Sequence, residues 1–257
     1  MSHTALSFSY NGLHLKGGKY TQIDPMKHLK MLIAAIDCAN PEGKCDVIVS
    51  AISFDFNNLS LEEKTLALKI YKKAKVVSTK NKENHQNGAA LSIKMAIEAA
   101  ASINAKYLIH LAEDIIMSPD FIEYFEKHLS DCDYVGTHWF VKDLKKRTST
   151  LNTQVFGCRV SSFFDENQKK SIIFQKEVKN IEIELYDSII SIGLKYKIGA
   201  CEKNLFAYPD HRTVPYPEGI GGGPLLYEHT HDPDEFRKII ESRGVKWTEN
   251  DKKPTML

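Results

Sequence analysis

The sequence predicts an α/β fold in which a mostly parallel sheet is flanked by helices. Short apolar runs alternate four times with amphipathic segments between residues 4 and 129, which indicates parallel strands joined by helical crossovers. One run, residues 107–112, is apolar almost throughout, as expected of a central strand covered on both faces. With 257 residues, 42% of them hydrophobic, the chain can bury a sizeable core.

The first half of the chain predicts four strand–helix units. Turn residues, helix caps and apolar periodicity set their limits. Strands are expected at 4–9, 46–54, 75–78 and 107–112. Helices are expected after Asp24-Pro25, after a capping box of Ser60 and Glu63, over residues 89–104, and from Ser118-Pro119 to about Leu129.

The second half predicts a mixed α+β arrangement. Strands are expected at 133–137, 155–160 and 196–199, and helices at 182–192 and from Asp232-Pro233 to about Arg243. Residues 208–227 are rich in Pro and Gly and predict an irregular loop that could act as a lid. Because no linker divides the chain, we expect one domain over 1–257, with halves at 4–129 and 130–248.

Composition argues against several classes of protein. A net charge of +1 gives no global field to capture nucleic acid or an anionic membrane. The five cysteines form no Cys-x-x-Cys motif, which favours reduced thiols. No apolar run reaches the roughly 18 residues of a membrane span, and the first residues lack a signal-peptide pattern. We therefore expect a cytoplasmic protein with no integral membrane contact.

Two neighbouring acids, Glu113 and Asp114, follow the predicted central strand. Ligands of open α/β sheets bind at the carboxyl ends of strands, so this position predicts a binding site. Two carboxylates suit Mg²⁺ or Mn²⁺, and such an ion would neutralise charge on a diphosphate leaving group. The alternative is that Glu113 caps the following turn and Asp114 is merely solvated.

Several short motifs in residues 4–129 occur in the order and spacing of a known family. This half resembles the nucleotide-binding half of a GT-A glycosyltransferase, closest to the family 2 type. Ala112 replaces the first Asp of the family's Asp-x-Asp triplet. The motifs that carry the resemblance are Ser9-Tyr10-Asn11, Asn87-Gly88, Ala112-Glu113-Asp114 and Ser118-Pro119-Asp120-Phe121.

The resemblance implies a Rossmann-like sheet that binds a nucleotide-diphosphate sugar with Mn²⁺ or Mg²⁺. Such an enzyme transfers the sugar to an acceptor hydroxyl. Gly157 stands on a segment that resembles the family's acceptor-side strand, and Asp55 follows the second predicted strand. The expected donor-binding residues are Ser9, Tyr10, Asn11, Asp55, Asn87, Gly88, Glu113 and Gly157.

The resemblance also places Glu182 on the acid of the family's Glu-Asp motif, the general base of inverting members. A base there would take the proton from the acceptor hydroxyl as it attacks the sugar. Glu184, two residues later, is the second catalytic candidate, and Asp187 is a third on another face of the helix. The alternative is an acidic helix N-terminus favoured by the helix dipole.

Histidines in the C-terminal segment are further candidates for metal ligands. GT-A enzymes often supply a histidine from this region, and His229 and His231 lie close together in the sequence. Neutral imidazole suits Mn²⁺ better than Mg²⁺. The alternative is a pair of surface histidines before a helix. His110 lies inside the apolar run and is expected to be a hydrogen-bonded core histidine.

Three functions fit these observations. The leading one is a metal-dependent glycosyltransferase, which inverts the sugar configuration if Glu182 is the base. Its acceptor is left open between a glycan, a lipid carrier, a protein and a modified nucleic acid. The second is a sugar nucleotidylyltransferase, which needs a Gly-rich basic loop after the first strand. Residues 16–19 match that loop only faintly. The third is a catalytically inactive protein that binds nucleotide sugars.

Overall fold

A computed structural model describes residues 3–11, 25–80, 85–117, 121–136, 153–174, 178–198, 227–229, 233–242 and 244–247. Its centre is a seven-stranded sheet in which β7 runs antiparallel to both neighbours and the other pairings are parallel. The predicted α/β class and the central place of residues 107–112 are thereby confirmed. The strand order is β10 (Tyr196–Ile198), β6 (Tyr134–Gly136), β7 (Val155–Arg159), β4 (Tyr107–Ala112), β1 (Thr4–Asn11), β2 (Asp46–Ile52) and β3 (Lys75–Thr79).

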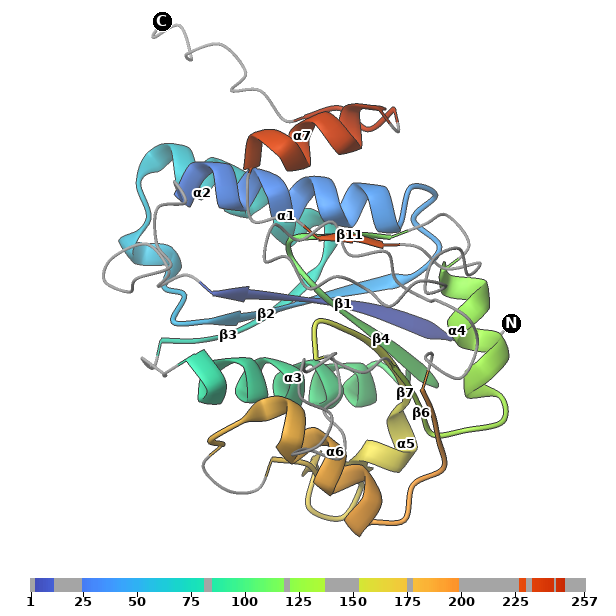
Figure 1. Cartoon of the computed structure of the whole chain (residues 1–257). Helices are drawn as coiled ribbons and strands as arrows, with labels where there is room; N and C mark the ends of the chain where they lie inside the picture. The colour runs from blue at the N-terminus through green and yellow to red at the C-terminus, as the bar shows by residue number, and fades with distance from the viewer. Residues whose placement is uncertain are drawn as a thin grey trace, which may run out of the picture.

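Helices cover both faces of the sheet (Figure 1). On one face α1 (Pro25–Ala39), α2 (Leu61–Lys73) and α4 (Phe121–Leu129) share a core with every second residue of β1, and α7 (Pro233–Ser242) packs on α1 through Phe236. The other face carries α3 (His85–Ser102), α5 (Val160–Phe163) and α6 (Ile181–Ser191). No helix in the described ranges has the length and apolar composition of a membrane-spanning segment.

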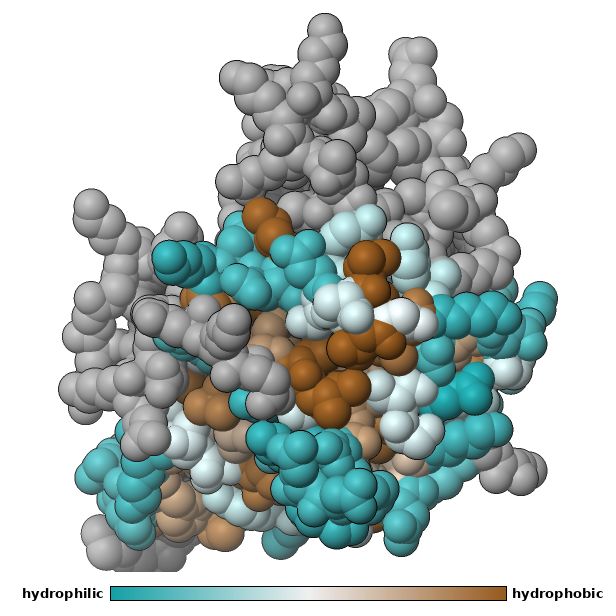
Figure 2. All heavy atoms as spheres, turned by 90° about the horizontal axis from the view of Figure 1, so that it is seen from below, coloured by the Kyte–Doolittle hydropathy of each residue, from teal (hydrophilic) through white to brown (hydrophobic). Residues whose placement is uncertain are grey.

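The face that carries α3 and α6 is not wholly polar. Figure 2 shows this side, where apolar groups gather near the middle of the described surface. The exposed large apolar side chains include Ile190 in the last turn of α6, Ile192 just after that helix, and Tyr196 on β10. Part of the apolar surface of α6 therefore faces away from the sheet.

Most predicted elements lie close to their expected limits, and the differences have local causes. The capping box is present, because Glu63 N donates to Ser60 Oγ and Ser60 N donates to Glu63 Oε2. The second strand ends at Ile52, two residues early, because Ser53 adopts a φ of 55° and Asp55 then caps a short 3-10 turn, η1 (Phe56–Asn58). Residues 16–19, 118–120 and 208–226, on which other predictions were made, lie outside the described residues.

The sequence did not predict several short elements. A three-residue strand, β5 (Ile115–Met117), pairs with β11 (Tyr227–His229) in a separate antiparallel sheet. The helix α5 and a small hairpin of β8 (Phe164–Asp165) and β9 (Lys170–Ser171) follow β7. Elements of two to four residues leave almost no periodicity to detect.

Helix α3 connects the two halves of the chain. Glu98 Oε1 accepts a hydrogen bond from Ser171 N at 3.1 Å, and Lys94 Nζ donates to Phe174 O at 3.3 Å. Nearer its start, Asn87 Oδ1 accepts from Val178 N and Gln86 Oε1 from Ile181 N, both at 2.8 Å. Side chains of α3 therefore hold the backbone of the segment that leads into α6.

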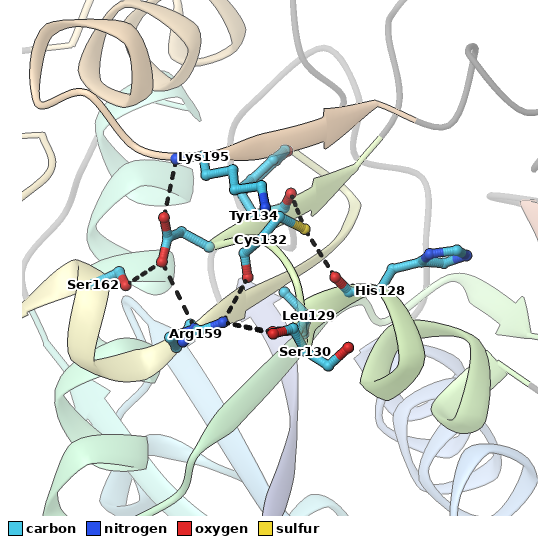
Figure 3. Close-up of polar contacts among 9 residues, drawn as sticks. His128, Leu129, Ser130, Cys132, Tyr134, Arg159, Ser162 and Lys195 are labelled. Carbon is cyan, nitrogen blue, oxygen red and sulfur yellow. Dashed lines mark hydrogen bonds and ion pairs between the residues drawn. The ribbon is translucent and has the colours of Figure 1, made fainter.

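At the amino edge of the sheet, where the parallel strands begin, charged groups bind main-chain atoms (Figure 3). Asp133 accepts hydrogen bonds from Ser162 Oγ at 2.6 Å and from Lys195 N at 2.9 Å. Arg159 Nη2 donates to carbonyl oxygens near the end of α4. Its positive charge there also interacts favourably with the negative end of the helix dipole. We call this set the amino-edge cluster: Asp133, Arg159, Ser162, Lys195 and the carbonyls of Leu129, Ser130 and Cys132.

Candidate active site

The carboxyl ends of β1 and β4 bring the predicted site residues together. The two strands are parallel neighbours, with Ser9 level with Ala112 in the register. Ser9 Oγ donates a hydrogen bond to Glu113 Oε2 at 3.4 Å. The first predicted motif therefore contacts the acid pair directly, as expected for strand ends that meet at one edge of a parallel sheet.

His28, a residue that sequence analysis did not select, holds Glu113 from the other side. His28 Nε2 lies 2.8 Å from Glu113 Oε1, and the two side chains are only 5% and 14% exposed. A buried carboxylate needs such partners, because desolvation of an unpaired charge is costly. The signal that could have revealed His28 is its position one helical turn before Leu32, on the buried stripe of α1, where a polar side chain requires a partner.

Tyr10 lies beside this pair but inside the core. Its side chain is 3% exposed, and its ring centroid lies 5.1 Å from that of His28 and 5.7 Å from that of Phe54. Burial, reinforced by the negative charge of Glu113, raises the pKa of the Tyr10 hydroxyl. The Tyr10 ring therefore packs in the core beside His28. Its expected contact with the donor stays a prediction. Asn11 ends β1, and its side chain lies outside what the structure describes.

The strand pair β5–β11 brings the C-terminal segment to the acid pair. Asp114, 8% exposed, directly precedes β5, and the register pairs Ile115 with His229. The backbone of His229 therefore lies beside the residue that follows Asp114. Carboxylate and imidazole donors from these two segments match the ligand chemistry of Mn²⁺.

The described side chains do not form a complete set of metal ligands by themselves. Among them, no group of three His, Cys, Asp or Glu side chains is close enough to hold a metal ion. The side chain of His229 and the whole of His231 lie outside the described part. The fold thus brings Glu113, Asp114 and the His229 backbone to one place, and metal binding by these residues stays a prediction.

Asp55 stands at the same edge but has structural partners. It accepts hydrogen bonds at 3.1 Å from Asn57 N and from Asn58 Nδ2, and its Oδ2 lies 3.1 Å from Lys80 Nζ. The hydrogen bond from Lys80, followed by that from Asn57 N, lowers the pKa of the Asp55 carboxyl. Asp55 therefore joins the ends of β2 and β3, and a nucleotide contact stays a prediction.

The first turns of α3 and α6 meet near the same edge. Helix α3 starts after the carboxyl end of β3, with Asn87 and the buried Gly88 in its first turn. The hydrogen bonds of Gln86 and Asn87 then bring the start of α6 to it, together with Glu182 and Glu184, which are partly exposed. Topology thus places both predicted catalytic acids on the helix end nearest the acid pair's edge of the sheet.

Gly157 occupies a different environment from the other predicted residues. It lies in the middle of the sheet, level with Ile109 of β4 and Val135 of β6. A Cβ atom there would lie 2.5 Å from Phe125 Cδ1 and 3.1 Å from Leu129 Cδ1. Close packing of α4 on the sheet explains the glycine by itself, and a contact with substrate stays a prediction.

The structure confirms that His110 is a core histidine. It is 2% exposed, and its Nδ1 forms a hydrogen bond with Ser7 Oγ at 2.9 Å. Burial lowers its pKa to about 3, so the ring is neutral at physiological pH. His110 therefore belongs to the core between the sheet and α3, and has no part in the site.

Comparison with known proteins identifies the fold. No family model and no curated protein sequence matches the chain. Among solved structures, the galactosyltransferase LgtC in complex with donor and acceptor sugar analogs is similar with a TM-score of 0.53 and 9% identity, over 96% of this chain and 98% of LgtC. The chain therefore has the GT-A fold, as the resemblance implied. Membership of family 2 stays a prediction.

Two further solved structures are similar at lower scores. A protein described as a nucleotide-diphospho-sugar transferase, from Desulfovibrio desulfuricans G20, has a TM-score of 0.47 and 14% identity over 76% of this chain and 79% of its own. The CMP:2-keto-3-deoxy-manno-octonic acid synthetase complexed with CTP has a TM-score of 0.46 and 9% identity over 95% of this chain and 99% of its own. Neither score adds to the assignment of the fold.

Proposed function

We propose that this protein is a metal-dependent glycosyltransferase that moves a sugar from a nucleotide-diphosphate donor to an acceptor hydroxyl. One observation carries the proposal: the strand pair β5–β11 brings the backbone of His229 beside the residue that follows Asp114, at the sheet edge where Ser9 meets Glu113. The carboxyl edge of the strands is also where open α/β sheets bind their ligands.

Asp114 is the principal metal ligand in this proposal, with His229 or His231 as the imidazole donor. Glu113 contributes less to metal binding, because His28 and Ser9 already bind its carboxylate. A bound Mn²⁺ or Mg²⁺ would neutralise the charge that develops on the leaving nucleoside diphosphate. Ser9, Asn11 and Gly88 would then line the donor.

Glu182 is the proposed general base, with Glu184 as the alternative. A carboxylate at the first turn of α6 would accept the proton of the acceptor hydroxyl during attack on the anomeric carbon. Attack from the side opposite the leaving group inverts the configuration, so we propose an inverting enzyme. The acceptor is a glycan, a lipid carrier, a protein or a modified nucleic acid.

Isothermal titration of UDP, GDP and TDP, each with and without Mn²⁺, tests the donor site. We expect one nucleotide to bind in the micromolar range only when Mn²⁺ is present, and Asp114→Asn to abolish the metal-dependent part. Asp131→Asn, which changes an exposed acid at the amino edge, is the matched control and should bind like the wild type. Absence of binding by every nucleoside diphosphate would contradict the proposal.

Product analysis separates transfer from the other two functions. The protein is incubated with a sugar donor that carries the nucleoside diphosphate found to bind, together with a panel of simple acceptors. We expect the nucleoside diphosphate to be released. Release of pyrophosphate from a nucleoside triphosphate and a sugar phosphate would instead identify a nucleotidylyltransferase. Tight nucleotide binding without turnover of any donor, even by hydrolysis, would identify an inactive binding protein.

A further inference from the structure

We infer that Gln86 and Asn87 are positioning residues that hold the first turn of α6, and through it Glu182, in place for proton transfer. The inference rests on the proposed function, because it gives Glu182 the role of base. It concerns two adjacent side chains at the start of α3, which we call the α3 clamp. Sequence analysis assigned Asn87 to the donor and did not select Gln86.

The α3 clamp binds two backbone amides of the other half of the chain. Gln86 Oε1 accepts a hydrogen bond from Ile181 N, and Asn87 Oδ1 accepts one from Val178 N, each at 2.8 Å. The partners lie 95 and 91 residues away in the sequence. Ile181 is the first residue of α6, so the clamp contacts the helix end itself.

The backbone N–H groups in the first turn of α6 need acceptors from outside the helix. The first N–H groups of a helix have no acceptor within the helix. Here Asn180 Oδ1 accepts from Ile183 N at 2.9 Å as the cap, and Gln86 supplies the acceptor for Ile181 N. Without Gln86, the amide of Ile181 would lose this fixed acceptor, and the turn would lose one of its directional contacts.

Apolar packing and the clamp fix different degrees of freedom of α6. Ile181, Leu185 and Ile189 are at most 2% exposed and decide which side of α6 faces the core. Apolar contacts are not directional, so they tolerate a small slide along the helix axis. Hydrogen bonds are directional and restrict that slide.

The position of the clamp relative to the other α3 contacts indicates a functional role. Glu98 and Lys94 already attach residues 171 and 174 to α3. The clamp adds a second attachment immediately beside Glu182, the neighbour of Ile181. Misplacement of a catalytic group by about 1 Å can lower the rate about a hundredfold, so an attachment at this point matters for catalysis.

Isosteric variants test the clamp. Gln86→Met and Asn87→Leu remove each acceptor while keeping the size of the side chain, whereas Gln86→Glu and Asn87→Asp keep an acceptor. Amide hydrogen exchange reports on the contact without any substrate. We expect the amides of Ile181 and Val178 to exchange faster in the first pair and to recover in the second, while Gln168→Met, at an exposed glutamine, changes neither.

Kinetics then test the effect on Glu182. We expect Gln86→Met to lower kcat by about 10- to 100-fold, with the donor KM within about twofold of the wild type, and Gln86→Glu to recover most of the loss. In a Glu182→Gln background, Gln86→Met should cause no further loss, because both changes act on one step.

Several results would overturn the inference. If Gln86→Met speeds amide exchange but leaves kcat unchanged, the clamp is purely structural. If Gln86→Met lowers kcat as much in the Glu182→Gln background as in the wild type, the clamp acts on something other than Glu182. A large rise of donor KM in Asn87→Leu would assign Asn87 to the donor instead. If the wild type binds no nucleoside diphosphate and turns over no donor, the proposed function itself fails, even where the exchange result stands.

Discussion

The two edges of the central sheet both gather charged side chains, but they use them differently. At the amino edge, Asp133 accepts a hydrogen bond from the main-chain N–H of Lys195, and Arg159 donates to the carbonyl oxygens of Leu129, Ser130 and Cys132 at and after the end of α4 (Figure 3). At the carboxyl edge, Glu113 binds the side chains of His28 and Ser9, and Asp114 stands where two short strands meet. We infer that the charges bound to the main chain stabilise the fold, and we propose that the acids at the strand ends serve the chemistry.

The comparison predicts that loss of a single acid at the carboxyl edge abolishes activity without unfolding the protein. Asp114→Asn keeps the size of the side chain but weakens its hold on a cation. We expect kcat/KM for sugar transfer with Mn²⁺ to fall by about a hundredfold or more, because a metal ion supplies several kcal/mol of stabilisation of the developing charge. Initial-rate measurements check this, and an unchanged kcat/KM would remove Asp114 from the mechanism.

The opposite result is expected at the amino edge. Asp133→Ala removes the acceptor of Ser162 Oγ and Lys195 N and the anionic neighbour of Arg159. We expect the free energy of unfolding to fall by about 2–3 kcal/mol, because these donors lose their partners. Urea unfolding measures the loss, and Asp133→Asn, which keeps an acceptor, should lose less. Donor affinity per folded molecule should not change, and a selective loss of donor binding would contradict the distinction between the edges.

Gly157 lies between the two edges, and a methyl group there tests packing against substrate contact. In Gly157→Ala the new Cβ would lie 2.5 Å from Phe125 Cδ1. We expect a loss of about 1–3 kcal/mol in the free energy of unfolding from overpacking. The double variant with Phe125→Leu should recover part of it, as thermal unfolding would show. Weaker donor binding at unchanged stability would instead support the predicted substrate contact.

The buried His110 predicts a pH dependence of stability that neither edge causes. Its pKa is about 3 in the folded protein against 6.5 when unperturbed, so the unfolded chain binds a proton first as the pH falls. This group then destabilises the fold below about pH 6.5, by about 2 kcal/mol between pH 7.5 and pH 5. Urea unfolding at both pH values checks this, and His110→Asn should reduce the difference by that amount. An equal difference in the variant would contradict it.

Local signals in the sequence were enough to predict most of the fold. Apolar runs with clear turn residues predicted β1, β2, β3 and β4, and the motif Ser60-x-x-Glu63 predicted the start of α2. These features depend on neighbouring residues, which a sequence displays directly. Where an element ends elsewhere than predicted, the cause can be a single residue. The strand β2 ends at Ile52 and not at residue 54, because the backbone of Ser53 adopts a positive φ.

The parts that could not be predicted depend on contacts between distant segments. β5 and β11 are three residues each and pair across more than a hundred residues, so neither has a local pattern. The bond between His28 and Glu113 and the α3 clamp also join distant segments. The local patterns therefore named the candidate acids but gave no sign of His28, which binds Glu113, or of Gln86, which binds the start of α6.

The central claim is that Asp114 binds a divalent cation at the carboxyl edge of the sheet. Anomalous diffraction from crystals soaked with Mn²⁺ and the nucleoside diphosphate that binds in solution tests it most directly. We expect one strong peak within bonding distance of the Asp114 carboxylate and of an imidazole from His229 or His231. A peak elsewhere, or no peak while the nucleotide occupies the site, would contradict it.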